Sequence, residues 1–108
     1  MTEKDKSMII EFKERIPGQI RKQLVRIIIF GSRANGKASR YSDLDIAVLL
    51  KRKTHQLEKY LEDVAYNLMW EHDFKPVISL KVFGQEDFER RFKQGFSFYR
   101  HVRAGIVV

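Results

Sequence analysis

The sequence contains no cysteine, only two prolines and one tryptophan, and it has no long apolar run. Without cysteine the chain forms neither a disulfide nor a thiolate zinc site, which fits a reducing cytosol. No stretch approaches the roughly 20 apolar residues of a membrane span. The N-terminal stretch is polar and lacks the apolar centre of a signal peptide. We therefore expect a cytoplasmic protein that does not enter a membrane.

Acidic residues are the minority charge, with 14 Asp and Glu against 21 Lys and Arg, which leaves a formal net charge of +7. A basic surface favours phosphate-bearing ligands, nucleic acid or an acidic partner protein. The same charge also keeps a small domain in solution without any such ligand. The charge therefore admits a nucleotide, an RNA or a protein partner and does not choose among them.

The 108 residues are enough for one small domain with a single modest core, over residues 1–108. Apolar spacing and turn residues predict, in chain order, a helix at 5–16, a helical turn at 21–24, strands at 25–30 and 44–50, a helix at 55–73, a strand at 77–83, a helix between Gly84 and Gly95, and a last helix at 98–103. This order predicts an α/β (α+β) fold with three to four strands covered by helices. The apolar end at 106–108 either adds an edge strand or packs into an interface, which leaves an oligomer open.

Two aspartates separated by one residue, Asp43 and Asp45, open the second expected strand. Side chains two apart on a strand point the same way, so both carboxylates converge on one face while Leu44 points into the core. Like charges there repel and are costly to desolvate, and a divalent cation or the solvent edge of the sheet would offset that cost. Oxygen ligands with open positions suit Mg²⁺ or Mn²⁺. The alternative is that Ser42 and Asp43 only cap a turn before an edge strand.

A Gly-Ser pair follows the first expected strand. Gly31 lets the backbone approach a phosphate without a Cβ in the way, and Ser32 offers its hydroxyl and amide to β- and γ-phosphate oxygens. Arg33 either adds a cation to that site or faces solvent on the loop. Together with Asp43 and Asp45 on the next strand, the run predicts a triphosphate cradle beside a metal site.

The stretch from Ile29 to Val48, which contains these motifs, resembles the signature of the minimal nucleotidyltransferases, in the superfamily of DNA polymerase β and kanamycin nucleotidyltransferase. The resemblance implies a mixed sheet flanked by helices, Mg²⁺, a nucleoside triphosphate that is usually ATP, and transfer of a nucleoside monophosphate to a hydroxyl. It also implies that Gly31 and Ser32 contact the triphosphate, while Asp43 and Asp45 bind the metal and carry catalysis.

The resemblance extends to a partner. Many stand-alone members resemble the antitoxin half of a two-gene pair, whose other half is a helical ribonuclease toxin of the HEPN type. Some of these antitoxins inactivate the toxin by adenylylating a tyrosine. The implied acceptor is therefore a hydroxyl on such a protein, or on an RNA.

The chain departs from the family at the third carboxylate, which normally stands on the next strand of the sheet. By our alignment Ser79 occupies that position, and a neutral hydroxyl is neither a base nor a good metal ligand. Lys81 lies on the same face and further disfavours a second cation. Three alternatives follow: one metal with a base from Glu71, Asp73 or the acceptor; nucleotide binding without transfer; or a partner-binding module that has lost its chemistry.

The remaining candidates all have an ordinary structural role as their alternative. Tyr41, next to the aspartates, either stacks on a base or ribose or packs in its loop. The C-terminal aromatic residues either fill the core or form an exposed patch for a partner: Phe92, Phe96, Phe98 and Tyr99. The three histidines lie on different elements without ligand spacing, and we expect them at the surface or at the boundary of the core: His55, His72 and His101.

Overall fold

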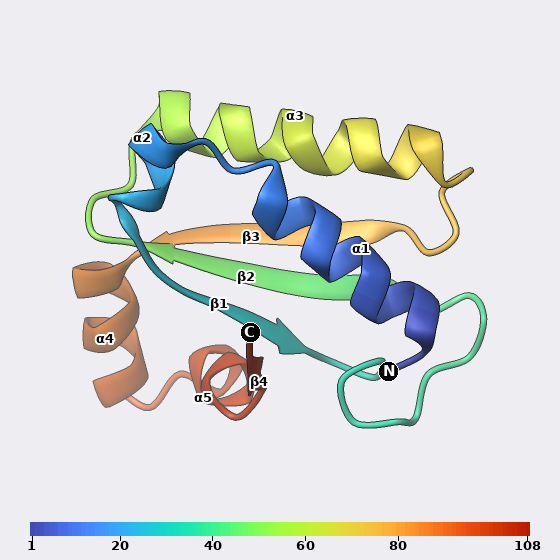
Figure 1. Ribbon diagram of the computed structural model, residues 1–108. Coiled ribbons are helices and arrows are strands. Elements are labelled where there is room, and N and C mark those ends of the chain that lie inside the picture. Colours follow the sequence, from blue (N-terminus) through green and yellow to red (C-terminus); the bar gives the residue numbers. More distant parts are fainter.

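The computed structural model describes residues 1–108 as three layers, with one sheet between two layers of helices (Figure 1). The elements in chain order are α1 (Glu3–Glu14), α2 (Gly18–Arg21), β1 (Leu24–Phe30), β2 (Leu44–Leu50), α3 (His55–Glu71), β3 (Ile78–Gly84), α4 (Gln85–Lys93), α5 (Ser97–Arg103) and β4 (Ile106–Val107).

The sheet is mixed, with four strands in the order β3-β2-β1-β4. β1 runs antiparallel to both β2 and β4, whereas β2 runs parallel to β3. A parallel pair needs a crossover connection, and α3 supplies it between β2 and β3. The predicted fold, a small mixed sheet flanked by helices, is confirmed.

β1 and β2 occupy the middle of the sheet and are buried on both faces. Every residue from Ile27 to Phe30 and from Ile46 to Leu50 is buried. Alternate side chains enter two separate apolar clusters, one against α1 and α3 and the other against α4 and α5. Burial on both faces explains why these strands read as near-continuous apolar runs. Asp45 is the one residue of β2 that is not buried.

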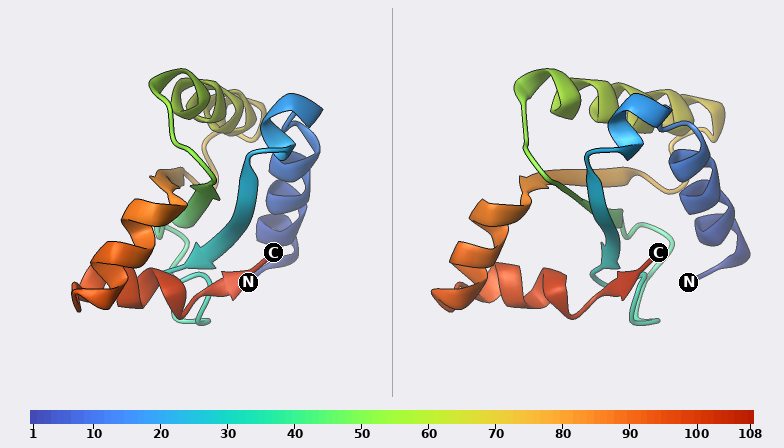
Figure 2. Two further views of the ribbon diagram at one scale, coloured as in Figure 1. Left: turned by 90° about the vertical axis from the view of Figure 1, so that its left-hand side faces the viewer. Right: turned by 60° about the vertical axis from the view of Figure 1, so that its left-hand side comes forward.

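The helices divide between the two faces of the sheet (Figure 2). On one face, α1 contributes Phe12 and α3 contributes Leu61 and Leu68 to the larger apolar cluster. On the other face, Phe88 of α4 and Val102 of α5 enter the smaller cluster. None of these helices has both the length and the apolar character needed to cross a bilayer.

The first helix begins earlier than the predicted residue 5, because a cap fixes its start. The Thr2 hydroxyl accepts a hydrogen bond from the Asp5 backbone N–H at 3.0 Å, and the Asp5 carboxylate accepts one from the Thr2 N–H at 3.2 Å. This reciprocal capping box satisfies two otherwise free donors, so α1 starts at Glu3. α2 also begins before the predicted turn, directly after Pro17.

The later boundaries lie close to the predicted ones. β2 coincides with the prediction at both ends. α3 stops at Glu71 rather than at residue 73, and Asp73 and Phe74 both have a φ of 56°, a left-handed value that no α-helix contains. β3 begins at Ile78, one residue later than predicted.

The apolar C-terminal residues form an edge strand, which settles the choice left open by the sequence. Ile106 pairs with Ile29 and Val107 with Ile28. The Val108 N–H donates to the Ile27 carbonyl at 3.0 Å. These bonds extend the sheet beyond β1 and hold α5 against the same strand.

Candidate functional site

Asp43 and Asp45 lie at the start of β2, on either side of Leu44. Leu44 is fully buried in the cluster that faces α1 and α3, so both aspartates point to the opposite face. Asp43 is exposed and Asp45 is half-buried. The structure therefore places the two carboxylates together, at the solvent-accessible end of a buried strand.

Gly31 brings the loop after β1 directly against Asp45. In the register of β1 and β2, Phe30 lies opposite Asp45, and the chain then turns at Gly31 with a φ of +78°. A Cβ at this position would overlap Oδ2 of Asp45 and would lie 3.2 Å from its Cγ. Two features therefore require glycine at position 31: the left-handed backbone and the close approach to the carboxylate.

The turn that follows Gly31 leaves several donors free. The Ala34 N–H donates to the Gly31 carbonyl at 3.2 Å, and the Lys37 N–H donates to the Ser32 carbonyl at 3.0 Å. The backbone N–H groups of Ser32 and Arg33, and the Ser32 hydroxyl, have no partner within the protein. Successive free N–H groups in a tight turn form an anion-binding concavity.

The Arg33 side chain occupies neither of the two predicted places, the phosphate site or the solvent. It is buried. Its guanidinium donates to Asp5 of α1 at 3.0 Å, in an ion pair whose side chains are 8% and 2% exposed. It also donates to the carbonyls of Ser42 at 2.7 Å and Arg40 at 3.4 Å. Arg33 therefore ties both ends of the motif loop to α1, and its side chain supports the loop.

The next strand carries no carboxylate at the site. In the parallel register of β2 and β3, Ser79 lies beside Asp45 and Lys81 lies beside Ala47. Ser79 is half-buried and Lys81 is exposed. No group of three His, Cys, Asp or Glu side chains that could enclose a metal occurs in the protein. The predicted alignment of Ser79 beside Asp45 agrees with this register.

Glu71 is held by an ion pair on the opposite face of the sheet and does not reach Asp43 or Asp45. It forms a two-pronged ion pair with Arg15 of α1, at 2.5 and 2.9 Å, and this hydrogen bonding lowers the pKa of Glu71. Glu71 ends α3, which covers the face opposite to Asp43 and Asp45. Of the carboxylates proposed as a base, Glu71 is thus excluded by position.

Helix α5 borders the site on one side, which the sequence did not predict. The rings of Phe98 and His101 both meet Phe30 edge to face, with centroids 6.0 and 5.9 Å away. Phe30 lies opposite Asp45, so His101 lies on the same side of the sheet as the carboxylate, while its side chain stays exposed as predicted. The three-residue spacing of Phe98 and His101 puts both on one helix face, and that was the available signal.

The C-terminal aromatic residues combine both roles that the sequence allowed. Tyr99 packs against the smaller apolar cluster. Phe96 and Phe98 are 51% and 41% exposed. Phe98 therefore presents an apolar surface next to the carboxylates while one ring edge contacts Phe30.

The environment of Asp45 disfavours its ionised form. Burial raises the pKa of Asp45, and the charge of Asp43 raises it further. The charges of Lys81 and His101 and the Ser79 hydroxyl oppose this shift, but the pKa remains above its ordinary value. A bound cation would reduce the cost of ionising Asp45, which is partly desolvated and close to a second carboxylate.

Replacing Asp45 with asparagine should therefore stabilise the ligand-free protein. Because the folded pKa is raised, the unfolded state releases its proton first as the pH rises above the ordinary value of 3.8, and stability falls over that range. We expect Asp45→Asn to raise the melting temperature by a few degrees at pH 7, with a gain that vanishes near pH 4. Thermal unfolding followed by circular dichroism at both pH values tests this, with Glu14→Gln as the exposed control. An unchanged or lower melting temperature at pH 7 would contradict it.

A hollow of about 640 Å³ adjoins the site, between the end of the motif loop and residues 73–77. Ser42, next to Asp43, lines it together with Arg40 and Tyr41. Tyr41 is 78% exposed, and the Arg40 guanidinium lies over its ring at 4.8 Å and donates to its hydroxyl at 2.6 Å. One ring face of Tyr41 is thus occupied, and stacking of a base or ribose on Tyr41 stays a prediction.

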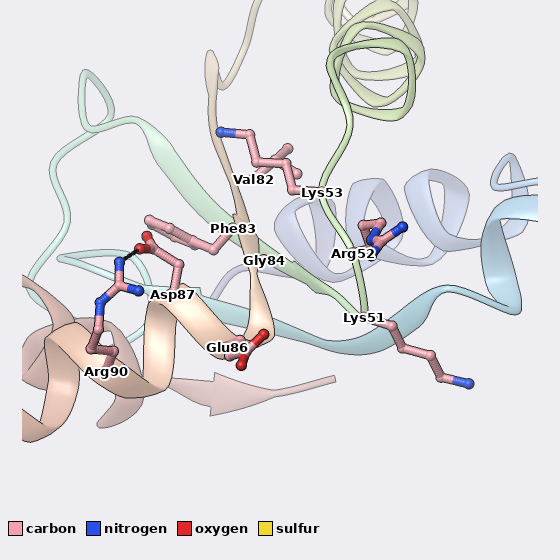
Figure 3. A pocket seen from close by; sticks show the side chains of 9 residues that line it. All are labelled: Lys51, Arg52, Lys53, Val82, Phe83, Gly84, Glu86, Asp87 and Arg90. Carbon is pink, nitrogen blue, oxygen red and sulfur yellow. Dashed lines mark hydrogen bonds and ion pairs between the residues drawn. The ribbon is translucent and has the colours of Figure 1, made fainter.

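A second hollow, of about 380 Å³, lies at the far end of the sheet, where β2 and β3 end (Figure 3). Half of its charged side chains form ion pairs: Arg90 pairs with Asp87 inside the hollow (Figure 3), and Lys53 pairs with Glu58 at 3.2 Å. The length of β2 separates it from Asp45. This hollow is therefore not part of the site formed by the motif loop.

A family model of the nucleotidyltransferase domain matches residues 3–100. No curated protein matches the chain. A chain in a crystal structure of a toxin–antitoxin with AMP-PNP is 22% identical, with a TM-score of 0.48 over 93% of this chain and 90% of that chain. A Sulfolobus solfataricus protein assigned as a nucleotidyltransferase is 22% identical, with a TM-score of 0.45 over 79% and 77%.

The family match extends over nearly the whole chain and includes the motif loop, both aspartates and the strand that carries Ser79. The chain belongs to the nucleotidyltransferase domain family.

Proposed function

We propose that this protein moves a nucleoside monophosphate from a nucleoside triphosphate, ATP or another, to a hydroxyl on a partner protein or an RNA in the cytoplasm. The observation that carries the proposal is the packing of Gly31 against Asp45. This contact puts the free donors of the loop beside a pair of carboxylates. Donors for phosphate oxygens and oxygen ligands for a cation are the two requirements for holding a metal-bound triphosphate.

The residues at the site fit one divalent cation, Mg²⁺ or Mn²⁺. Asp43 and Asp45 would supply two hard oxygen ligands. Burial and, second to it, the charge of Asp43 raise the pKa of Asp45, and a bound cation would offset both effects. Phosphate oxygens and water would complete the coordination, because no third carboxylate or histidine joins the pair into a ligand cluster. When bound, the cation supplies charge neutralisation for the triphosphate and the departing pyrophosphate.

The chain's own donors hold the leaving group. In the transfer, the acceptor oxygen bonds to the α-phosphorus, the bond from that phosphorus to the bridging oxygen breaks, pyrophosphate leaves, and the hydroxyl proton passes to water. The Ser32 hydroxyl and the N–H groups of Ser32 and Arg33 would donate to the β- and γ-phosphate oxygens. Donors already fixed by a turn stabilise developing charge without reorganisation. The Arg33 side chain takes no part, because it is bound to Asp5.

The acceptor is proposed to be carried by a macromolecule. Asp43 is exposed, Asp45 is partly exposed, and the wall formed by α5 presents the exposed ring of Phe98. An open face with an apolar wall suits a hydroxyl presented on a protein surface better than a small molecule that must be enclosed. A helical protein of the HEPN type, as the toxin to which this chain is the antitoxin, is our first candidate, with an RNA hydroxyl as the second.

Ser79 favours a second candidate function. With a hydroxyl where the family has a carboxylate, the protein would bind the nucleotide and the partner, and would neutralise the partner by binding alone. Both functions use the same loop and the same aspartates, so they differ only in whether the nucleoside monophosphate is transferred.

Labelled ATP distinguishes the two functions. The protein is incubated with labelled ATP and Mg²⁺, with and without the product of the neighbouring gene, and transfer of label is followed. We expect label on the partner or its RNA with the natural chain, and none with the double variant Asp43→Asn, Asp45→Asn. The matched control, Glu62→Gln with Asp63→Asn, removes two exposed charges from α3 and should keep the transfer.

Label transfer that survives in the aspartate variant would contradict the site. Absence of transfer under every condition, together with tight binding of the partner, would favour the binding-only function.

A further inference from the structure

Lys81 carries an unpaired charge on the face that bears the two aspartates. It follows Ser79 by two residues on β3, so both side chains point to this face. The side chain is exposed, and the lysines that form ion pairs are others, namely Lys6, Lys53 and Lys59. Its neighbour on β2 is the small residue Ala47.

The sheet register places Lys81 close to Asp45. Ser79 lies beside Asp45 across the β2–β3 pair, and Lys81 follows Ser79 by two residues on the same face. The strand therefore carries the ammonium on the face where a triphosphate bound at Asp43 and Asp45 would lie. No direct ion pair between Lys81 and Asp45 consumes this charge.

The transfer reaction would benefit from a second positive charge, beyond that of the one cation that Asp43 and Asp45 can hold. The two carboxylates fit one cation, and the neutral Ser79 offers nothing to hold another. Charge nevertheless develops on both the attacked phosphoryl group and the departing pyrophosphate during transfer. A fixed cation from the chain can neutralise part of it, as lysine does in other phosphate sites.

We propose that Lys81 is a catalytic residue, whose ammonium donates to the oxygens of the α-phosphoryl group in the place of a second metal ion. The proposal rests on the proposed function of the site. The step it assists is the one written above: the acceptor oxygen bonds to phosphorus, the bond to the bridging oxygen breaks, pyrophosphate leaves and the proton passes to water. Lys81 keeps its own protons throughout and contributes charge only.

A structural role for Lys81 is the competing explanation. β3 is an edge strand, and charged side chains on edge strands prevent pairing with other chains. That role predicts a change in self-association when the charge is removed. It predicts no change in the affinity for a triphosphate without metal.

Binding of ATP in the presence of EDTA, measured by titration calorimetry, separates the two roles because it does not depend on a loaded metal site. We expect Lys81→Gln to weaken this binding about tenfold, the lower end for a charge-assisted hydrogen bond at an exposed position. Lys81→Arg keeps the charge and should retain most of the affinity. The matched control Lys93→Gln removes an exposed charge from α4 and should bind as the natural chain does.

The outcomes bear differently on the two proposals. If the natural chain binds ATP and Lys81→Gln binds it equally well, the role of Lys81 is overturned and the proposed function stands. If the natural chain binds ATP neither with EDTA nor with Mg²⁺, both fall together. Sedimentation of Lys81→Gln completes the test. A tenfold loss of affinity in a variant that sediments as the natural chain does supports the catalytic role. New self-association with unchanged ATP affinity supports the edge-strand role.

Discussion

Replacing Asp5 with alanine should lower the free energy of unfolding by about 3–5 kcal/mol, the cost of removing one partner from a buried ion pair. Asp5 is the only counter-charge of the Arg33 guanidinium, at 3.0 Å, and the two side chains are 2% and 8% exposed. Removing the carboxylate leaves a buried cation without a counter-charge. For a domain whose total stability is about 5–15 kcal/mol, this is a large part of the whole.

The same change should loosen the motif loop. Arg33 also donates to the carbonyls of Ser42 and Arg40, so its guanidinium joins α1, the loop and the residue before Asp43. Once Asp5 is lost, the guanidinium gains by turning to water, and these two bonds go with it. We therefore expect ATP to bind more weakly to Asp5→Ala, even under conditions in which the variant is folded.

Urea unfolding followed by fluorescence measures the loss, and two further variants isolate its cause. Thr2→Ala removes the other half of the capping box and should lower the free energy of unfolding by only about 1 kcal/mol. The double variant Asp5→Leu, Arg33→Met replaces the pair by apolar side chains and should recover much of the stability. Equal losses for Asp5→Ala and Thr2→Ala would mean that the ion pair contributes nothing.

The sequence predicts the strands best where one physical cause dominates. β2 was predicted at both ends because burial on both faces gives a continuous apolar run, bounded by Asp43 and by Lys51. The neighbourhood of Asp45 and Ser79 was predicted from the resemblance, and the parallel register of β2 and β3 agrees with it. The apolar run and the family resemblance are therefore enough to predict the bounds of β2 and the position of Ser79 beside Asp45.

Contacts between residues far apart in the chain account for what the sequence did not predict. The sequence predicts Arg33 only as a loop residue, and no residue near it in the chain indicates that Asp5 is its ion-pair partner. His101 is exposed as predicted, but its contact with Phe30, opposite Asp45, depends on how α5 packs against the sheet. Glu71 reads as a free carboxylate until Arg15 binds it on the opposite face. Each of these placements depends on packing between elements, which periodicity does not describe.

These contacts also show how the fold prepares the site. β1 and β2 fix Gly31 against Asp45, the ion pair with Asp5 fixes the loop, and α5 closes one side with His101. These contacts therefore hold in place the loop donors and the Asp45 carboxylate that the proposed function uses. Preorganisation of this kind is what the binding of a highly charged triphosphate requires.

Replacing Gly31 with alanine should remove ATP·Mg²⁺ binding almost completely, by about a hundredfold or more, as displaced catalytic groups do elsewhere. Two effects act at this position. The φ of +78° disfavours any side chain, at a cost of about 1–2 kcal/mol. In addition, the new Cβ would overlap Oδ2 of Asp45, so either the loop or the carboxylate must move.

Gly36 provides a matched control for the first effect. Its φ is +77°, and a Cβ there would meet nothing within 4 Å. Gly36→Ala should therefore lower the free energy of unfolding by about 1–2 kcal/mol and keep ATP·Mg²⁺ binding. Urea unfolding and titration calorimetry on both variants separate backbone strain from the overlap, and similar nucleotide affinities in the two would contradict the contact between the loop and Asp45.

A second substitution distinguishes lost packing from lost chemistry at Gly31. The double variant Gly31→Ala, Asp45→Ala removes the atoms that the new Cβ would overlap, so it should unfold at a higher urea concentration than Gly31→Ala alone. It should still fail to bind ATP·Mg²⁺, because one of the two proposed metal ligands is gone. Recovery of stability without recovery of binding would mean that Gly31 serves to bring the phosphate loop against a carboxylate that the fold itself does not need.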